Sequence, residues 1–180
     1  LIDQQIPFTA VARSARRVQE MMAQRVVRLE SATYEIIETE HTVEALIKAF
    51  KGARVVCNTV GPFVNFGLTA VEAALKAGCH HIDTTGEQAY VLDMRERFGE
   101  QYRQAGLLLS PATSYMYSFA EIAAELALET PGVDVLETAT ICRGTRFAAA
   151  GVTVGSTASI FGMARVKQHY LWEKKLVEHP

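Results

Sequence analysis

The sequence predicts an α/β protein built on a doubly wound parallel sheet. Between residues 7 and 131, short apolar segments alternate with amphipathic segments of helical period, which is the pattern of such a sheet. The segment Ala53–Glu87 shows one unit most clearly: a buried strand, a glycine-proline turn, a helix, a glycine stop and a second strand. Polar residues follow both strands of this unit, and open α/β sheets bind their ligands beyond the carboxyl ends of their strands.

The alternation continues along the whole region. Five strands are expected, at Pro7–Arg13, Thr33–Glu38, Arg54–Val60, His80–Thr84 and Leu107–Ser110. Ser14 and Thr42 stand where the first two helices need N-caps. Apolar residues at helical spacing predict two further helices near Leu68–Ala77 and Tyr90–Ala105, and a glycine follows each of them.

The pattern changes after residue 131. A capping box made by Ser118 and Glu121 predicts the start of the last helix before this point. Beyond it we expect a strand, a small-residue segment and a helix, at Val133–Arg143, Thr145–Ser159 and about Ile160–Tyr170. We therefore predict one domain over residues 1–131 and the beginning of a second, α+β domain over residues 132–180, which serves substrate binding or dimerisation.

The glycine-rich turn that opens many nucleotide-binding sheets is not in this sequence. No G-x-G-x-x-G occurs in the 180 residues, and the first strand ends in Arg13. Such a turn belongs ~20 residues before the residue that contacts the ribose. We therefore expect the sheet to lack the strand that would precede Pro7–Arg13, which is strand 1 of the usual fold. In the strand order 3-2-1-4-5-6 the lost strand is central, which leaves two strands with open edges. We expect such a chain to recruit another chain or to be poorly soluble.

Composition is that of an ordinary soluble protein. Hydrophobic residues make up 49% of the chain and charged residues 21%, and the net charge is −2. This charge gives no reason to expect nucleic acid or an anionic membrane as a partner. No apolar run approaches the ~20 residues that span a bilayer. Three widely spaced cysteines indicate free thiols, so we expect a cytoplasmic protein.

Three segments together resemble a known family. The runs VVCNTVGPF, AGCHHIDTTGE and LLLSPAT are similar to those of the saccharopine dehydrogenase-like group, which includes the trans-acting enoyl reductases. The likeness covers roughly Pro7–Glu129 and implies a Rossmann-like, NAD(P)-binding domain. Many members carry Gly-Phe-Asp-Ser-x-Pro after the strand that corresponds to Leu107–Ser110, where this chain has Ser114–Phe119. That difference leaves the substrate class open.

Arg13 and Ser14 indicate which dinucleotide is bound. At the end of this strand an acidic residue accepts the ribose 2′-hydroxyl of NAD, whereas an arginine pairs with the 2′-phosphate of NADP. Ser14 and the following helix N-terminus add donors for an anion. The alternative is a solvated arginine beside an ordinary helix cap. With the family resemblance, the sequence predicts NADP.

The turn that ends the predicted strand Arg54–Val60 is the second candidate for cofactor binding. It consists of Asn58, Thr59, Val60, Gly61 and Pro62. Glycine permits close backbone approach to a ligand, and proline stiffens the turn. The resemblance implies contact with the ribose or nicotinamide side of the cofactor. The alternative is a tight turn in which Asn58 bonds its own backbone.

Candidates for proton transfer lie nearby. Asp83 is expected to face the ligand and is our candidate acid or base, together with the phenol of Tyr117. For Glu87 we favour an N-terminal charge on the helix that it begins. The run from Cys79 to Asp83 is no zinc site, because only His81 and Asp83 share a strand face.

Two functions follow from these residues. The first is an NADP-dependent oxidoreductase that transfers hydride to or from a small carbonyl, imine or enoyl substrate, and that forms a homo-oligomer. The second is a non-catalytic Rossmann-like binding or assembly module that has lost cofactor binding. The missing glycine-rich turn favours the second function, and the family resemblance favours the first.

Overall fold

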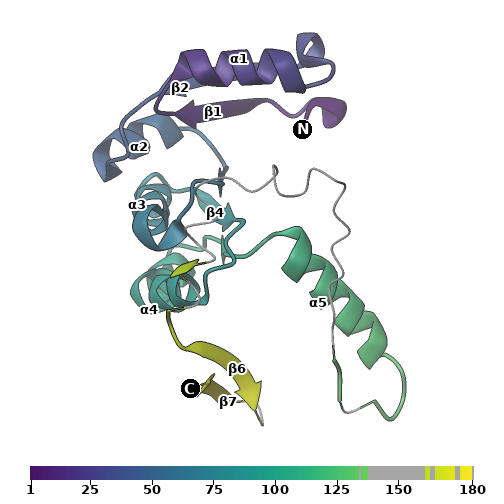
Figure 1. Cartoon of the computed structure of the whole chain (residues 1–180). Coiled ribbons are helices and arrows are strands. Elements are labelled where there is room, and N and C mark those ends of the chain that lie inside the picture. The colour runs from purple at the N-terminus through teal and green to yellow at the C-terminus, as the bar shows by residue number, and fades with distance from the viewer. Residues whose placement is uncertain (134, 138–160, 163–164, 173–174, 180) are drawn as a thin grey trace.

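The strands between residues 8 and 110 are parallel and belong to two separate sheets (Figure 1). The computed structural model describes residues 1–133, 135–137, 161–162, 165–172 and 175–179. One sheet pairs β1 (Phe8–Ala12) with β2 (Tyr34–Glu38), and the other has the order β3 (Val55–Asn58), β4 (His80–Asp83), β5 (Leu109–Ser110). Every pairing within these two sheets is parallel. The predicted α/β architecture is confirmed.

Each of the five strands is followed by a helix. These helices are α1 (Ala15–Arg25), α2 (Val43–Phe50), α3 (Phe63–Lys76), α4 (Gln88–Gln104) and α5 (Tyr115–Leu128). Short 3-10 turns occupy Ile2–Gln4 and Leu29–Ser31. Ser14 caps α1 by accepting the amide of Arg17, and Thr42 caps α2 by accepting the amide of Ala45, as predicted.

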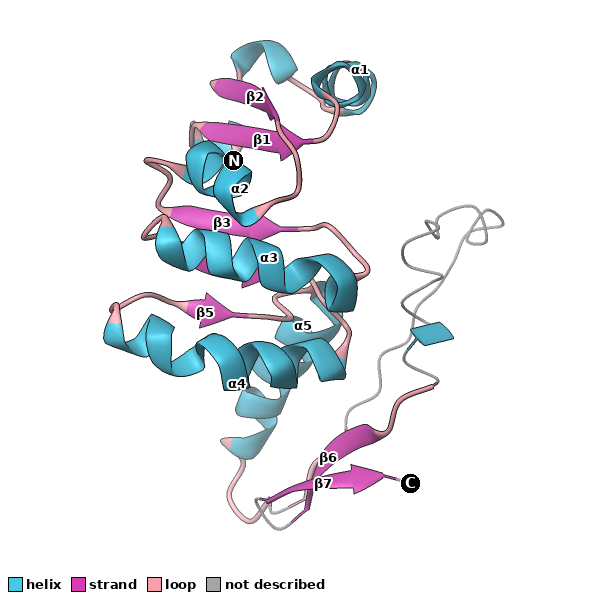
Figure 2. Ribbon diagram, turned by 90° about the vertical axis from the view of Figure 1, so that its left-hand side faces the viewer, coloured by secondary structure: helices cyan, strands magenta, loops and turns pink. Residues whose placement is uncertain are grey.

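Two apolar clusters hold α2, α3 and α4 side by side against one face of the strands (Figure 2). The first cluster joins α2 to α3 across β3, with Phe50, Val56 and Ala74 at its centre. The second joins α3 to α4 around the buried rings of Tyr90 and Tyr102. Helix α5 lies on the opposite side of β4 from α3 and α4 (Figures 1 and 2). Small residues on α3 allow this close packing, because three of its alanines are buried completely or nearly so.

The two sheets are not hydrogen-bonded to each other. Within the described residues, β1 pairs only with β2, and β3 pairs only with β4. The prediction that these two strands lack a shared partner is thus confirmed. On β3, Val55 is 46% exposed and Cys57 is exposed, whereas Val56 and Asn58 are buried. One face of β3 is therefore covered by helices and the other is open.

Two predicted helix boundaries are wrong. Helix α3 begins at Phe63, directly after Pro62, and not near Leu68. Helix α5 begins at Tyr115, one turn before the predicted capping box, so Ser118 lies inside the helix. Both errors come from reading the first strong apolar repeat as the helix start, whereas backbone geometry starts each helix at the preceding turn.

The C-terminal part contains an antiparallel hairpin of β6 (Gln168–Trp172) and β7 (Lys175–His179). The helix predicted up to Tyr170 is wrong for this stretch, because cross-strand pairing with β7 prevails over the local helical pattern. Residues 133 and 135–137 of the predicted strand Val133–Arg143 are not in a strand, and the rest of it lies outside the described residues. Most of the small-residue segment also lies outside them.

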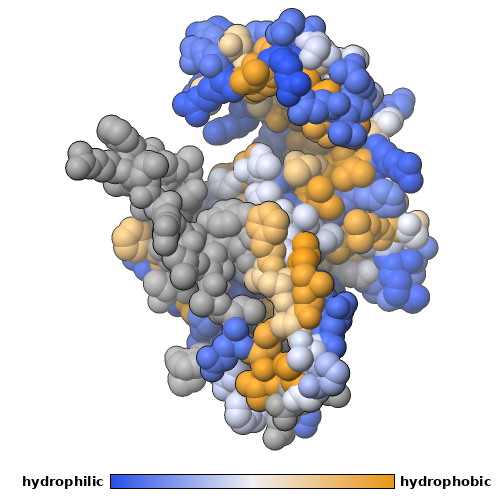
Figure 3. All heavy atoms as spheres, turned by 90° about the vertical axis from the view of Figure 1, so that its right-hand side faces the viewer, coloured by the Kyte–Doolittle hydropathy of each residue, from blue (hydrophilic) through white to orange (hydrophobic). Residues whose placement is uncertain are grey.

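An apolar stripe runs along the outer face of α5. Phe119, Ile122 and Leu126 follow one another at helical spacing and are 69%, 57% and 62% exposed. Figure 3 shows apolar side chains over this part of the molecule. No described helix is long and apolar enough to cross a membrane.

Candidate functional site

The strand ends that carry the predicted site residues meet at one edge of the sheet. Asn58 and Asp83 are direct register partners in the parallel pair of β3 and β4. The turns that follow them, residues 59–62 and 84–87, therefore leave the sheet at the same edge, as predicted. The turn after β5 joins them, since the amide of Thr113 donates to the carbonyl of Asp83 (2.7 Å).

Asp83 is wholly buried, and protein groups occupy both of its oxygens. Oδ1 accepts the amides of Thr85 and Ala112, each at 3.0 Å. Oδ2 accepts the Tyr90 hydroxyl at 2.9 Å and contacts Nε2 of His81 at 3.3 Å. Burial pushes the pKa of Asp83 upward, but these hydrogen bonds prevail and hold it below its usual value. The carboxylate thus joins β4, α4 and the turn after β5.

Glu87 acts on a different helix from the one we predicted. Its carboxylate accepts the amides of Phe63 (3.0 Å) and Val64 (2.9 Å), which are the first two residues of α3. The side chain is only 4% exposed. The predicted role as a helix N-terminal charge is therefore right in kind, but the helix is α3 and not α4. A buried negative charge on the amides of α3 stabilises that N-terminus and leaves no place there for a phosphate.

Gly67 and Tyr90 complete this buried support, and sequence reasoning did not single out Tyr90. A Cβ on Gly67 would lie 2.3 Å from Cε2 of Tyr90, so only glycine lets the ring pack against α3. The ring also contacts Phe63, with centroids 5.6 Å apart. Burial and the neighbouring carboxylate of Asp83 raise the pKa of Tyr90, so its hydroxyl remains a donor. A glycine inside an otherwise regular helix was the available signal.

The histidines of β4 serve the sheet. His81 is buried and contacts Asp83, while its Nδ1 has no partner in the described part of the chain. His80 accepts the amide of Leu108 through Nδ1 (2.9 Å). Among the described residues there is no cluster of three or more side chains suited to hold a metal ion.

Asn58 has one half of its amide engaged and the other half open. Its Oδ1 accepts the amide of Val60 (3.0 Å), which is the backbone-bonded turn that we kept as the alternative. Its Nδ2 is buried and has no partner among the described residues. A buried donor without an acceptor is costly, so this position suits a ligand acceptor. Thr59 and Val60 are exposed beside it, and Gly61–Pro62, a cis peptide, leads into α3.

At the end of β1, Arg13 is exposed and makes no ion pair or hydrogen bond with any described residue. Ser14 is engaged in capping α1. Glu38, at the end of β2, accepts the amide of Ala15 through Oε2 at 2.8 Å. An acidic side chain thus lies at the same helix N-terminus, and sequence reasoning missed it because it comes from a strand 23 residues away.

Tyr117 lies near the loop after β4 and not on Asp83 itself. Its hydroxyl donates to the carbonyl of Gly86 at 3.4 Å, a long hydrogen bond. The structure therefore brings the phenol to the edge where Asn58 and Asp83 end. Tyr117 and Asp83 are not in hydrogen-bonding contact.

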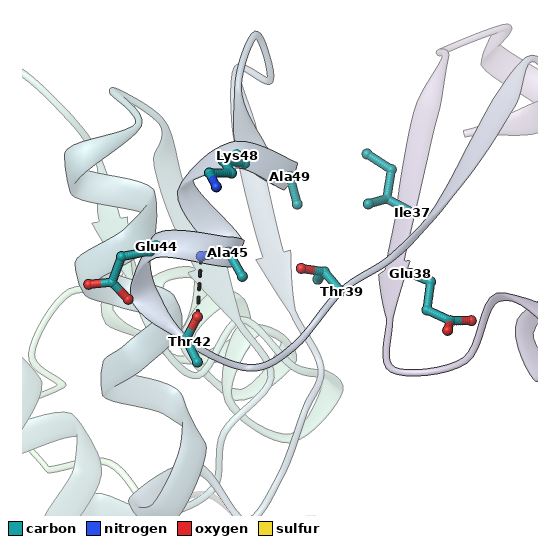
Figure 4. A pocket seen from close by; sticks show the side chains of 8 residues that line it. All are labelled: Ile37, Glu38, Thr39, Thr42, Glu44, Ala45, Lys48 and Ala49. Atoms are coloured by element: carbon teal, nitrogen blue, oxygen red, sulfur yellow. Dashed lines mark hydrogen bonds between the residues drawn. The ribbon is translucent and has the colours of Figure 1, made fainter.

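An open pocket of about 450 Å³ lies between the end of β2 and α2 (Figure 4). Ile37, Ala45 and Ala49 give it apolar walls, and Glu38 and Thr42 stand at its border. It adjoins the Glu38 end of the site and lies away from the buried network around Asp83.

Comparison with known proteins places this chain in a family. Residues 2–109 match the saccharopine dehydrogenase NADP binding domain. The chain belongs to this family. NADP is accordingly the cofactor of the domain, and the predicted Rossmann-like fold is confirmed. Residues 118–180 match a family of unknown function, DUF5938.

Two curated relatives match more than half of the chain. A protein of Caenorhabditis elegans named for its localisation to lipid droplets is 26% identical over 113 residues, which is 61% of this chain and 26% of that protein. A Mycobacterium tuberculosis protein, provisionally named a trans-acting enoyl reductase, is 29% identical over 107 residues, 58% of this chain and 26% of that protein. The chain thus matches about a quarter of the length of these relatives.

The described residues fit NADP at two places. The buried Nδ2 of Asn58 offers a donor without an acceptor at the ligand edge of β3. The uncommitted guanidinium of Arg13 lies at the end of β1, where a 2′-phosphate is bound in this fold. The pyrophosphate, in contrast, finds no site at the N-terminus of α3, because Glu87 occupies it.

Proposed function

We propose that this chain is the cofactor-binding part of an NADP-dependent oxidoreductase acting on a small carbonyl, imine or enoyl substrate. The observation that carries the proposal is the open Asn58 donor at the shared edge of β3 and β4 in a domain of an NADP-binding family. When bound, the nicotinamide supplies or accepts the hydride. The protein binds and orients it beside the substrate.

Each site residue has a stated part in this proposal. Arg13, with Ser14 beside it, binds the 2′-phosphate, and the turn Asn58–Pro62 shapes the nicotinamide side. Tyr117 is the candidate proton donor to the atom next to the carbon that receives hydride. Asp83, predicted as a catalytic residue, has both oxygens occupied, so we assign it the role of positioning the turns after β4 and β5 and the start of α4.

Further parts of the proposal concern the whole protein. We propose that residues 132–180 begin a second domain, and that the protein is cytoplasmic and forms a homo-oligomer. The exposed stripe of Phe119, Ile122 and Leu126 on α5 supports association, since apolar patches of this kind mark interfaces.

The alternative is a binding or assembly module without catalysis. The occupied oxygens of Asp83 favour it, because this buried carboxylate is not free to exchange a proton. A titration of the intact protein with NADPH separates the two functions. We expect saturable binding that weakens about tenfold in Arg13→Ala and stays unchanged in Arg25→Ala, a matched loss of charge in the last turn of α1.

Turnover then tests catalysis. With a small enoyl or carbonyl substrate that the wild type reduces, Tyr117→Phe is expected to lower kcat and leave NADPH binding intact. Absence of NADPH binding would favour the module, which has lost cofactor binding, and would overturn the oxidoreductase. Binding of NADPH without turnover of any such substrate would contradict the proposed catalysis and leave the cofactor assignment intact.

A further inference from the structure

The N-terminus of α1 already holds a negative charge. Oε2 of Glu38 accepts the amide of Ala15 at 2.8 Å, and Ser14 accepts the amide of Arg17 at 3.4 Å. Two of the amides that a helix N-terminus offers to an anion are therefore satisfied from within the chain.

Glu38 stands next to the residue that is expected to contact the 2′-phosphate. It is the register partner of Ala12, and the amide of Thr39 donates to the carbonyl of Ala12 at 2.9 Å. Arg13 follows Ala12 directly. Even so, Glu38 and Arg13 form no ion pair in the described structure, and the guanidinium stays free.

The two side chains have opposite preferences for the adenosine ribose. Arg13 attracts the phosphate that distinguishes NADP from NAD. The carboxylate of Glu38 repels that phosphate and competes with it for the amide of Ala15. Its second oxygen, which has no partner among the described residues, can accept the 2′-hydroxyl of NAD, as acids at this edge do in NAD-binding domains.

We infer that Glu38 is a specificity-determining residue that limits the preference of this domain for NADP over NAD. The inference rests on the proposed cofactor site at Arg13. An acid from the neighbouring strand opposes the effect of Arg13. The domain therefore binds both dinucleotides, and its affinity for NADP exceeds that for NAD by a smaller factor than Arg13 alone would give. Removal of the charge on Glu38 increases the ratio of NADP affinity to NAD affinity.

Calorimetric titration of the intact protein with NADPH and with NADH tests the inference. Glu38→Gln keeps an oxygen for the Ala15 amide and removes the charge. We expect NADPH to bind about fivefold more tightly, because one charge near a helix end and a bound phosphate is worth a factor of this size. NADH lacks the phosphate, so it should not bind more tightly to this variant, in which the single amide oxygen stays with Ala15.

Glu35→Gln is the matched control. Glu35 is an exposed acid on the same strand, three residues before Glu38, and its neutralisation changes the net charge equally. An NADPH-to-NADH affinity ratio that moves no further in Glu38→Gln than in Glu35→Gln would overturn the role of Glu38 while leaving the cofactor assignment intact. If the wild type binds neither dinucleotide, both the proposed function and this inference are overturned. A far-ultraviolet circular dichroism spectrum identical to wild type shows that the variant is folded.

Discussion

Replacement of Gly67 by alanine places one methyl group against the buried ring of Tyr90. The added carbon would lie 2.3, 2.6 and 2.9 Å from Cε2, Cζ and Oη of Tyr90. The ring cannot move aside freely, because it is 1% exposed, packs on Phe63 and donates to Asp83 at 2.9 Å. The contact therefore falls on the rigid part of the side chain.

Three contributions set the size of the effect. Alanine stabilises a helix interior by about 1 kcal/mol relative to glycine. Overpacking of a filled core costs about 1 to 3 kcal/mol. Displacement of the Tyr90 hydroxyl leaves a buried charged acceptor with one donor fewer, which costs about 1.5 to 3 kcal/mol. We expect Gly67→Ala to lower the free energy of unfolding by about 1.5 to 5 kcal/mol.

Urea denaturation followed by circular dichroism measures this difference. Gly99→Ala in α4 is the matched control, because a Cβ there meets its nearest heavy atom, Cγ of Arg95, at 3.8 Å. That variant should be more stable than wild type by about 0.5 to 1 kcal/mol. In a Tyr90→Leu background, which removes the ring, Gly67→Ala should lose most of its cost. A Gly67→Ala protein as stable as wild type would refute the reasoning.

Three further outcomes follow from the same region. Asp83→Asn should reduce the loss of unfolding free energy in acid. The pKa of Asp83 is lower in the folded than in the unfolded state, so the stabilisation by its carboxylate is present above the unfolded pKa. That stabilisation is lost as pH falls below about 4 through the folded pKa. An unchanged curve of unfolding free energy against pH would contradict this. Glu87→Gln should destabilise by about 1 kcal/mol or more. Glu72→Gln, a partly exposed residue of α3 that pairs only with Lys76 among the described residues, should change stability by less than about 0.5 kcal/mol. Equal effects of the two substitutions in urea denaturation would contradict this. Gln88→Ala should speed amide hydrogen exchange in Gln168–Trp172 without lowering the melting temperature, because its side chain holds this strand by two backbone hydrogen bonds; unaltered exchange there would count against it.

Local chemistry was sufficient to predict most of the fold. Periodic apolar residues located the five strands, and Ser14 and Thr42 were recognised as caps because each cap bonds within its own first turn. The shared edge of Asn58 and Asp83 was also predictable, since parallel strands of one sheet end on the same side. The open edges of β1 and β3 followed from the missing glycine-rich turn and the strand order.

The errors have two physical causes. The stretch ending at Tyr170 carries a helical pattern, yet it forms β6 because β7 pairs with it. Helices α3 and α5 begin earlier than their apolar repeats because the turn before each one sets the backbone.

From its sequence alone, this chain is a parallel α/β domain with polar residues at the ligand edge and an arginine suited to NADP, because periodicity and strand-end chemistry are local properties. Tertiary structure decided which partner each polar group meets. Glu87 reaches α3 from 23 and 24 residues away, Glu38 reaches α1 from 23, and the Tyr90 ring fills the space left by Gly67. Such contacts depend on how helices and strands pack in space, which no spacing along the chain records.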